Sequence, residues 1–145
     1  MTPTEAAGRR RGREAALQML YQAEIGSASA HEAIMTYWPT HDPEGEVPES
    51  MRTFANALVH GTTGRRAEID SLLTSHARNW RIDRMSVIDR IVLRLAIYEF
   101  LTELDTPAPV VINEALELAR TFSGDEAVAF VNGVLDAVRK DLGRH

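Results

Sequence analysis

The 145-residue sequence contains no cysteine, which excludes disulfides, thiol catalysis and zinc sites with cysteine ligands. It has no apolar run long enough to cross a bilayer, and an amphipathic pattern, not the apolar core of a signal peptide, follows the arginines near its N-terminus. Glycine and proline are few, while alanine, leucine, glutamate and arginine are common. This composition is typical of a helical domain of ordinary size in the reducing cytoplasm, without a membrane contact.

The motifs of common enzymes are also missing. There is no G-x-S-x-G sequence, no glycine-rich phosphate loop and no dinucleotide fingerprint. His31-Glu32 begins like the zinc motif H-E-x-x-H, but Met35 stands where the second histidine should be. The other histidines show no metal-ligand spacing. We therefore expect a protein without catalytic residues, cofactor or metal site.

Charge is unevenly distributed along the chain. The formal net charge is −5, yet residues 1–13 carry +3, because they hold four arginines and Glu5, which leaves −8 on the remainder. Guanidinium groups stay charged and can bind a phosphate with two parallel hydrogen bonds. A short basic segment on an acidic body therefore suggests a local RNA contact. The alternative is a solvated segment that aids solubility, and charge alone does not decide between them.

Apolar residues recur every three or four positions almost throughout, which predicts an all-α fold of about seven helices. We expect a first helix from about Thr4 or Arg9 to Ile25, a second around 31–38, and a third from Pro48 or Glu49 that Gly61 and Gly64 weaken or end. The remaining helices carry apolar residues within 69–80, 88–104, 112–122 and 130–138. A loop is expected from Pro39 to Pro48, and capping boxes are expected at Ser86/Asp89 and Ser123/Glu126.

The helix that opens at Ser86 has apolar residues on two sides, including Leu104, and is predicted to be the buried centre of the domain. Its charges form either a narrow solvated stripe or a surface that selects a partner. These charged residues are Asp89, Arg90, Arg94 and Glu99.

Two aromatic residues lie near the predicted capping box at Ser123. Aromatics at helical spacing usually belong to the core, but they can also stack on an unpaired base. Periodicity favours the core for Phe130 and leaves both interpretations open for Phe122.

Four sequence blocks together resemble the NusB family of bacterial transcription antitermination factors. They are residues 9–21 (RRRGREAALQMLY), 88–100 (IDRIVLRLAIYEF), 111–122 (VINEALELARTF) and 130–136 (FVNGVLD). The blocks occur in the order typical of the family and cover nearly the whole chain, with residues 26–50 least similar.

The resemblance implies an all-α domain of two packed helical sub-bundles over residues 9–142, preceded by a flexible arm at 1–8. It also implies binding of single-stranded boxA RNA together with the ribosomal protein NusE, within the RNA polymerase antitermination complex that transcribes through terminators, notably on ribosomal RNA operons. Some relatives self-associate, so a homodimer is a further expectation.

The resemblance assigns roles to individual residues. Those expected at the RNA are Arg9, Arg10, Arg11 and Arg13 on its backbone, with Phe122 and Glu126 near its bases. Those expected at NusE are Tyr21 and Asp89, with Arg90 and Arg94 nearby. The chain departs from the family at Ala129, where a basic residue is usual, and at Asp89, where glutamate is frequent. Glu126 stands where the family often has Asp or another polar residue.

Two other functions fit a helical RNA-binding pattern. One is the RNA-binding domain fused to ribosomal RNA cytosine methyltransferases, which would need a downstream methyl-donor domain that a chain ending at His145 does not provide. The other is a protein-interaction bundle with no RNA role, for which RNA binding would not exceed background even before mutation of the four arginines.

Overall fold

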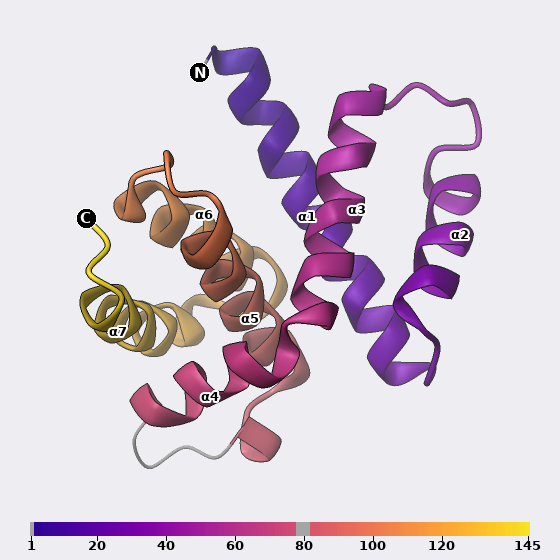
Figure 1. Ribbon diagram of the computed structural model, residues 1–145. Coiled ribbons are helices and arrows are strands. Elements are labelled where there is room, and N and C mark those ends of the chain that lie inside the picture. The colour runs from indigo at the N-terminus through magenta and orange to yellow at the C-terminus, as the bar shows by residue number, and fades with distance from the viewer. Residues whose placement is uncertain (1, 78–81) are drawn as a thin grey trace. The chain divides into compact units, whose positions relative to one another are not determined.

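The computed structural model describes residues 2–77 and 82–145, and within these ranges it contains seven α-helices, one 3-10 helix and no strand (Figure 1). The chain divides into two compact units, Met1–Gly64 (unit 1) and Arg65–His145 (unit 2). The all-α prediction is confirmed. None of the described helices is both long and apolar enough to span a membrane.

Unit 1 consists of α1 (Pro3–Ile25), α2 (Ala30–His41) and α3 (Glu49–Gly64). The helix starts follow from local chemistry: Thr2 accepts a hydrogen bond from the backbone N–H of Glu5, and Ser29 forms a reciprocal capping box with Glu32. Helix α1 packs mainly along α3, with α2 against both (Figure 1). Their buried residues include Ala15, Ala16, Leu17, Met19, Ala55, Leu58 and Val59.

The second helix is longer than predicted. The loop expected from Pro39 begins only at Asp42, because α2 continues through Pro39 to His41. Proline removes its own N–H donor and crowds the carbonyl four residues earlier. The turn after it nevertheless remains bonded: the Thr40 hydroxyl donates to the Thr36 carbonyl at 2.9 Å and the Asp42 N–H donates to the Trp38 carbonyl at 2.8 Å.

Asp42 organises the connection from α2 to α3. Its carboxylate accepts hydrogen bonds from the backbone N–H groups of Glu46 and Val47, both at 2.9 Å, and from the guanidinium of Arg52. The Arg52 guanidinium carbon also lies 4.9 Å from the centre of the Trp38 ring. These contacts link the end of α2 to the first turns of α3, which borders the site described below.

Unit 2 consists of α4 (Arg66–His76), the 3-10 helix η1 (Ile82–Arg84), α5 (Val87–Thr102), α6 (Ala108–Phe122) and α7 (Asp125–Asp141). Helix α5 is the predicted central helix: it contacts α4, α6 and α7, and Val92, Leu93 and Ile97 are fully buried. Leu104 is 69% exposed because α5 ends at Thr102, so its expected place in the apolar stripe was wrong. Trp80 lies outside the described residues.

The two predicted caps of unit 2 differ in outcome. The Ser86 hydroxyl accepts a hydrogen bond from the Asp89 N–H at 3.1 Å, as expected for the N-cap of α5. The box at Ser123/Glu126 was wrong, because Gly124, at φ 125°, precedes α7 and no side chain caps this helix. Gly124 also donates to the Ala119 carbonyl at 2.8 Å, so this glycine ends α6 in a conformation that other residues rarely adopt.

Candidate nucleic-acid interface

The arginine segment, defined as Arg9, Arg10, Arg11 and Arg13, lies within α1. A helix has about 3.6 residues per turn, so Arg9 and Arg13 share one side and the other two point elsewhere. Arg13 is only 4% exposed and Arg9 is half-buried, whereas Arg10 and Arg11 are exposed. The four guanidinium groups are therefore not equally accessible to a ligand.

Phe54 from α3 contacts the two less exposed arginines, Arg9 and Arg13. Its ring centre lies 4.8 Å from the guanidinium carbon of Arg9 and 5.5 Å from that of Arg13. Such cation–π contacts hold both side chains in place. Phe54 was not among the residues predicted from the sequence. The signal that pointed to it was Gly12, an unfavourable residue inside a helix, which marks a close approach of another element.

Gly12 makes this approach possible. A Cβ atom at position 12 would lie 2.8 Å from Cδ2 of Phe54, closer than packed carbon atoms allow. Four residues earlier, Gly8 offers a similarly bare surface, where an added Cβ would meet only the terminal methyl of Met51, at 3.5 Å. A distance of 3.5 Å is ordinary packing, so it is Gly12 that allows α3 to approach the arginine-bearing turns of α1.

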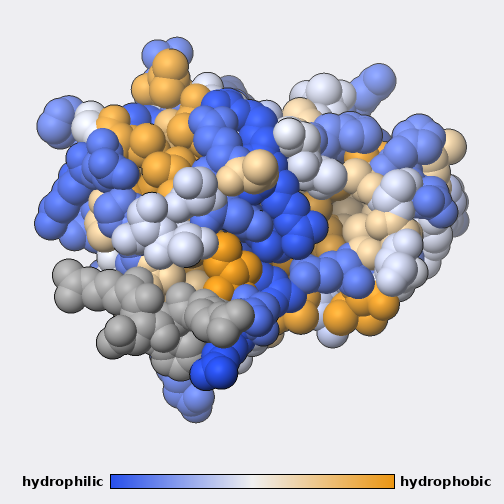
Figure 2. Space-filling view, turned by 60° about the horizontal axis from the view of Figure 1, so that its bottom comes forward, coloured by the Kyte–Doolittle hydropathy of each residue, from blue (hydrophilic) through white to orange (hydrophobic). Residues whose placement is uncertain are grey.

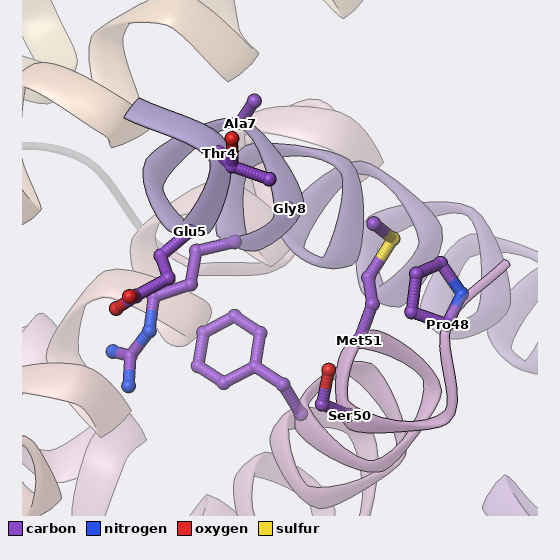
Figure 3. Close-up of a pocket in the computed structure, with 9 residues that line it drawn as sticks. Thr4, Glu5, Ala7, Gly8, Pro48, Ser50 and Met51 are labelled. Carbon is purple, nitrogen blue, oxygen red and sulfur yellow. The ribbon is translucent and has the colours of Figure 1, made fainter. Parts of the chain in front are cut away.

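A pocket of about 520 Å³ lies beside the arginine segment within unit 1. In Figure 3, Ser50 and Met51 at the start of α3, and Pro48 before it, lie opposite the turns of α1 that carry Glu5 and Gly8. Its complete lining is Thr4, Glu5, Ala7, Gly8, Arg9, Pro48, Ser50, Met51 and Phe54. Arg9 therefore belongs both to the basic segment and to the edge of this pocket.

A second pocket, of about 270 Å³, lies in unit 2 and brings together Asp89, Glu126 and Phe130. Phe130 is half-buried at its wall, so its expected place in the core was only partly right. Asp89 has one buried carboxylate oxygen, Oδ1, that finds no hydrogen-bond donor among the described residues. Phe122 is half-buried at the end of α6 and does not line this pocket.

The NusB family model matches residues 10–140, which is most of the chain. The chain belongs to the NusB family. A transcription antitermination protein NusB from Solibacter usitatus is 49% identical over 94% of this chain and 91% of its own. The NusB structure from T. maritima is 33% identical, with a TM-score of 0.82 over 92% of this chain and 91% of that one.

A further NusB-family structure is a complex of the antitermination factors NusB and NusE with double-stranded RNA. It is 26% identical to this chain, with a TM-score of 0.79 over 93% of this chain and 98% of the other. The resemblance first noticed in four sequence blocks is thus confirmed for both sequence and fold.

The residues that the NusB resemblance assigned to NusE lie in different surroundings. Arg94 is 6% exposed, and its Nε and Nη2 donate to the two carboxylate oxygens of Asp70 at 2.8 and 3.0 Å. Arg90 donates through Nη1 to the Ile82 carbonyl at 3.1 Å, which fixes the segment before α5. Both arginines therefore serve the interior of unit 2, and their contact with NusE stays a prediction.

Glu99 is 2% exposed, so neither it nor Arg94 belongs to a solvated stripe, and that interpretation of the α5 charges was wrong for both. The stripe fails because α5 is covered by three other helices of unit 2.

Tyr21 is the predicted NusE residue of unit 1, and it is 41% exposed on α1. On the face drawn in Figure 2, exposed apolar residues form separate patches among polar ones. Tyr21 is one of five large exposed apolar side chains among the described residues, with Ile25, Met35, Leu104 and Val110. This exposure makes the Tyr21 side chain accessible to another protein. Its contact with NusE stays a prediction.

Proposed function

We propose that this protein is a transcription antitermination factor that holds boxA RNA along the arginine segment while it binds the ribosomal protein NusE. Membership of the NusB family supports this function, because relatives matched over nine-tenths of their length carry that description. A related structure contains NusB, NusE and RNA together. The observation that carries the proposal is a row of arginines presented by a stable helix on an otherwise acidic chain.

In this proposal the arginines have different tasks. Arg10 and Arg11 contact phosphates directly, Arg9 does so at the edge of the pocket, and Arg13 supports the segment from its buried position on Phe54. Phosphate contacts position a strand without identifying its sequence, so bases must be recognised elsewhere. Phe122 and Glu126 remain candidates for that recognition.

NusE has the role of enlarging the RNA surface. Three accessible arginines on a chain of net charge −5 supply only a modest, salt-sensitive attraction. A second protein beside them raises affinity by adding contacts to the same strand. The complex then acts with RNA polymerase in the cytoplasm as a regulatory assembly, and this chain performs no chemical step.

A salt-dependent titration of boxA RNA tests this division of labour. Single-strand binding by Arg9, Arg10 and Arg11 predicts a slope of about −2.1 for log affinity against log salt, instead of about −2.8 for four contacts. Arg10→Ala with Arg11→Ala should weaken binding and reduce the slope by about 1.4. Arg65→Ala with Arg66→Ala removes the same charge outside the segment and should leave the slope unchanged.

The same titration with NusE completes the test. Added NusE should raise the affinity for the wild-type chain. Equal RNA affinity with and without NusE, or an Arg10/Arg11 variant that binds like the wild type, contradicts the proposal. RNA binding at background level in every variant would instead favour a protein-interaction bundle.

A further inference from the structure

The pocket between α1 and the start of α3 has apolar walls and a polar edge. The walls are formed by Ala7, Gly8, Pro48, Met51 and Phe54. The polar groups are Thr4, Glu5, Arg9 and Ser50. Its volume of about 520 Å³ lies within the range of about 300–1,000 Å³ that is usual for small-ligand sites, and such sites combine apolar walls with a few polar groups in the same way.

We propose that this pocket receives one unpaired base of the bound RNA strand, while the phosphate of that nucleotide lies at Arg9. The inference rests on the proposed function, since it places one nucleotide of the strand that the arginine segment holds. A base has flat apolar faces and a polar edge, which match the walls and the edge of the pocket. Any base can stack on an aromatic ring, so stacking in the pocket raises the affinity for RNA without selecting a particular base.

The ring that forms part of the wall is already held in place. Arg9 and Arg13 lie at 4.8 and 5.5 Å from the centre of the Phe54 ring, and Gly12 lets the ring sit close to α1. A wall that is ordered before the ligand arrives loses less conformational freedom on binding. Figure 3 shows Met51 beside the same turns of α1, where it supplies a second, adaptable apolar contact.

Charge places the base inside the pocket and leaves the phosphate outside it, beside Arg9. The pocket holds one acidic and one basic side chain, Glu5 and Arg9, so it has no net attraction for an anion. The Glu5 carboxylate instead accepts hydrogen bonds from amino groups, which adenine, cytosine and guanine present and uracil lacks. An apolar side chain of a protein partner would use neither Glu5 nor Arg9, whereas a nucleotide offers an amino group to the first and a phosphate to the second.

Two neighbouring alanines provide a matched pair of variants. Ala6 and Ala7 are both exposed on α1, but only Ala7 lines the pocket. Ala7→Trp fills the pocket with an indole, whereas Ala6→Trp adds the same side chain outside it. Each variant is titrated with boxA RNA and with a set of strands that each carry one abasic nucleotide. Helix content and NusE affinity are measured for both variants.

We expect Ala7→Trp to bind the intact strand about tenfold more weakly than Ala6→Trp does, within the range of one lost stacking contact. Its salt slope should match the wild type, because the arginines remain. At one position the abasic nucleotide should weaken binding to the wild type and to Ala6→Trp, but not to Ala7→Trp, since that contact is already lost. At this position Glu5→Gln should reduce the preference for cytidine over uridine.

The possible failures are distinguishable. If the wild type binds RNA with the expected salt slope and Ala7→Trp binds equally well, the pocket holds no base although the proposed function stands. A loss of NusE affinity without a loss of RNA affinity in Ala7→Trp assigns the pocket to a protein and overturns the inference. No RNA binding by the wild type overturns the proposed function and the inference together.

Discussion

Two glycines that lie inside helices, Gly12 and Gly133, differ in what surrounds them. Gly12 faces Phe54, whereas a Cβ atom at Gly133 in α7 would meet nothing within 4 Å. Replacing glycine by alanine in a helix stabilises it by about 0.8–1 kcal/mol. Gly133→Ala should therefore raise the free energy of unfolding by about 1 kcal/mol. Gly12→Ala should lower it, since displacing a packed ring costs about 1–3 kcal/mol.

Urea denaturation of the two variants measures this difference. Equal stabilisation by both would show that the Phe54 ring moves without cost. Phe54 would then not be the rigid support of Arg9 and Arg13 that the cation–π geometry indicates.

Asp42 makes the stability of unit 1 depend on pH. Burial raises the pKa of this carboxyl, but hydrogen bonds from the backbone of Val47 and Glu46 and the guanidinium of Arg52 outweigh burial and lower the pKa below its ordinary 3.8. A lowered pKa in the folded state means that stabilisation is present above pH 3.8 and is lost as the pH falls through the folded-state pKa.

Asp42→Asn should therefore lower the free energy of unfolding at neutral pH, and its difference from the wild type should shrink as the pH falls below 3.8. Urea titrations over this pH range measure both effects. Glu44→Gln removes an exposed charge from the same loop and is the control. A difference between Asp42→Asn and the wild type that is constant with pH would contradict the assigned role.

At the scale of the helix pair, α4 and α5 are joined by an ion pair with one buried partner. The side chain of Arg94 is 7% exposed and that of Asp70 is 26% exposed. Arg66 reaches the same carboxylate at 3.7 Å, but its side chain is 55% exposed. Removing Arg94 takes away two charge-assisted hydrogen bonds and the packing of its buried stem, although Arg66 still lies near Asp70, whereas the exposed Arg66 pair contributes little.

Arg94→Ala should therefore lower the free energy of unfolding by about 2 kcal/mol, the range of hydrogen bonds to a charged group, and Arg66→Ala by about 0–1 kcal/mol. Chemical denaturation of the two variants and of the wild type measures both values. Similar, small losses would contradict the structural role assigned to Arg94.

Across the whole molecule, burial predicts a wide range of local stability. Residues 3–8 of α1 are mostly exposed, whereas Val92, Leu93 and Ile97 of α5 have no exposed surface. Amide hydrogen exchange should be slowest in α5 within unit 2 and fastest at residues 4–8 within unit 1. Fast exchange there would support the predicted mobile arm at 1–8, although the structure places 3–8 in a helix. Exchange as slow as at Ala15 and Ala16 would exclude such an arm.

Much of the fold followed from local patterns. The helix period and the serine at the start of α5 were sufficient to predict seven helices and the central position of α5. The errors lay where tertiary contacts override local preference. Helix α2 runs through Pro39 because Tyr37 and Trp38 on the same turns are buried in unit 1, and Gly124 takes the turn that Ser123 was expected to cap.

The sequence by itself determined that this is an all-α member of the NusB family with a cluster of four arginines near its N-terminus, because periodicity, local charge and block order can be read along the chain. The tertiary structure decided which arginines are accessible, which pocket they border, and that Arg94 serves the interior of unit 2. Those outcomes depend on Phe54 and Asp70, each more than twenty residues away along the chain from the arginine that it contacts. Tertiary packing brings such pairs together, and their contacts cannot be predicted from the spacing of residues along the sequence.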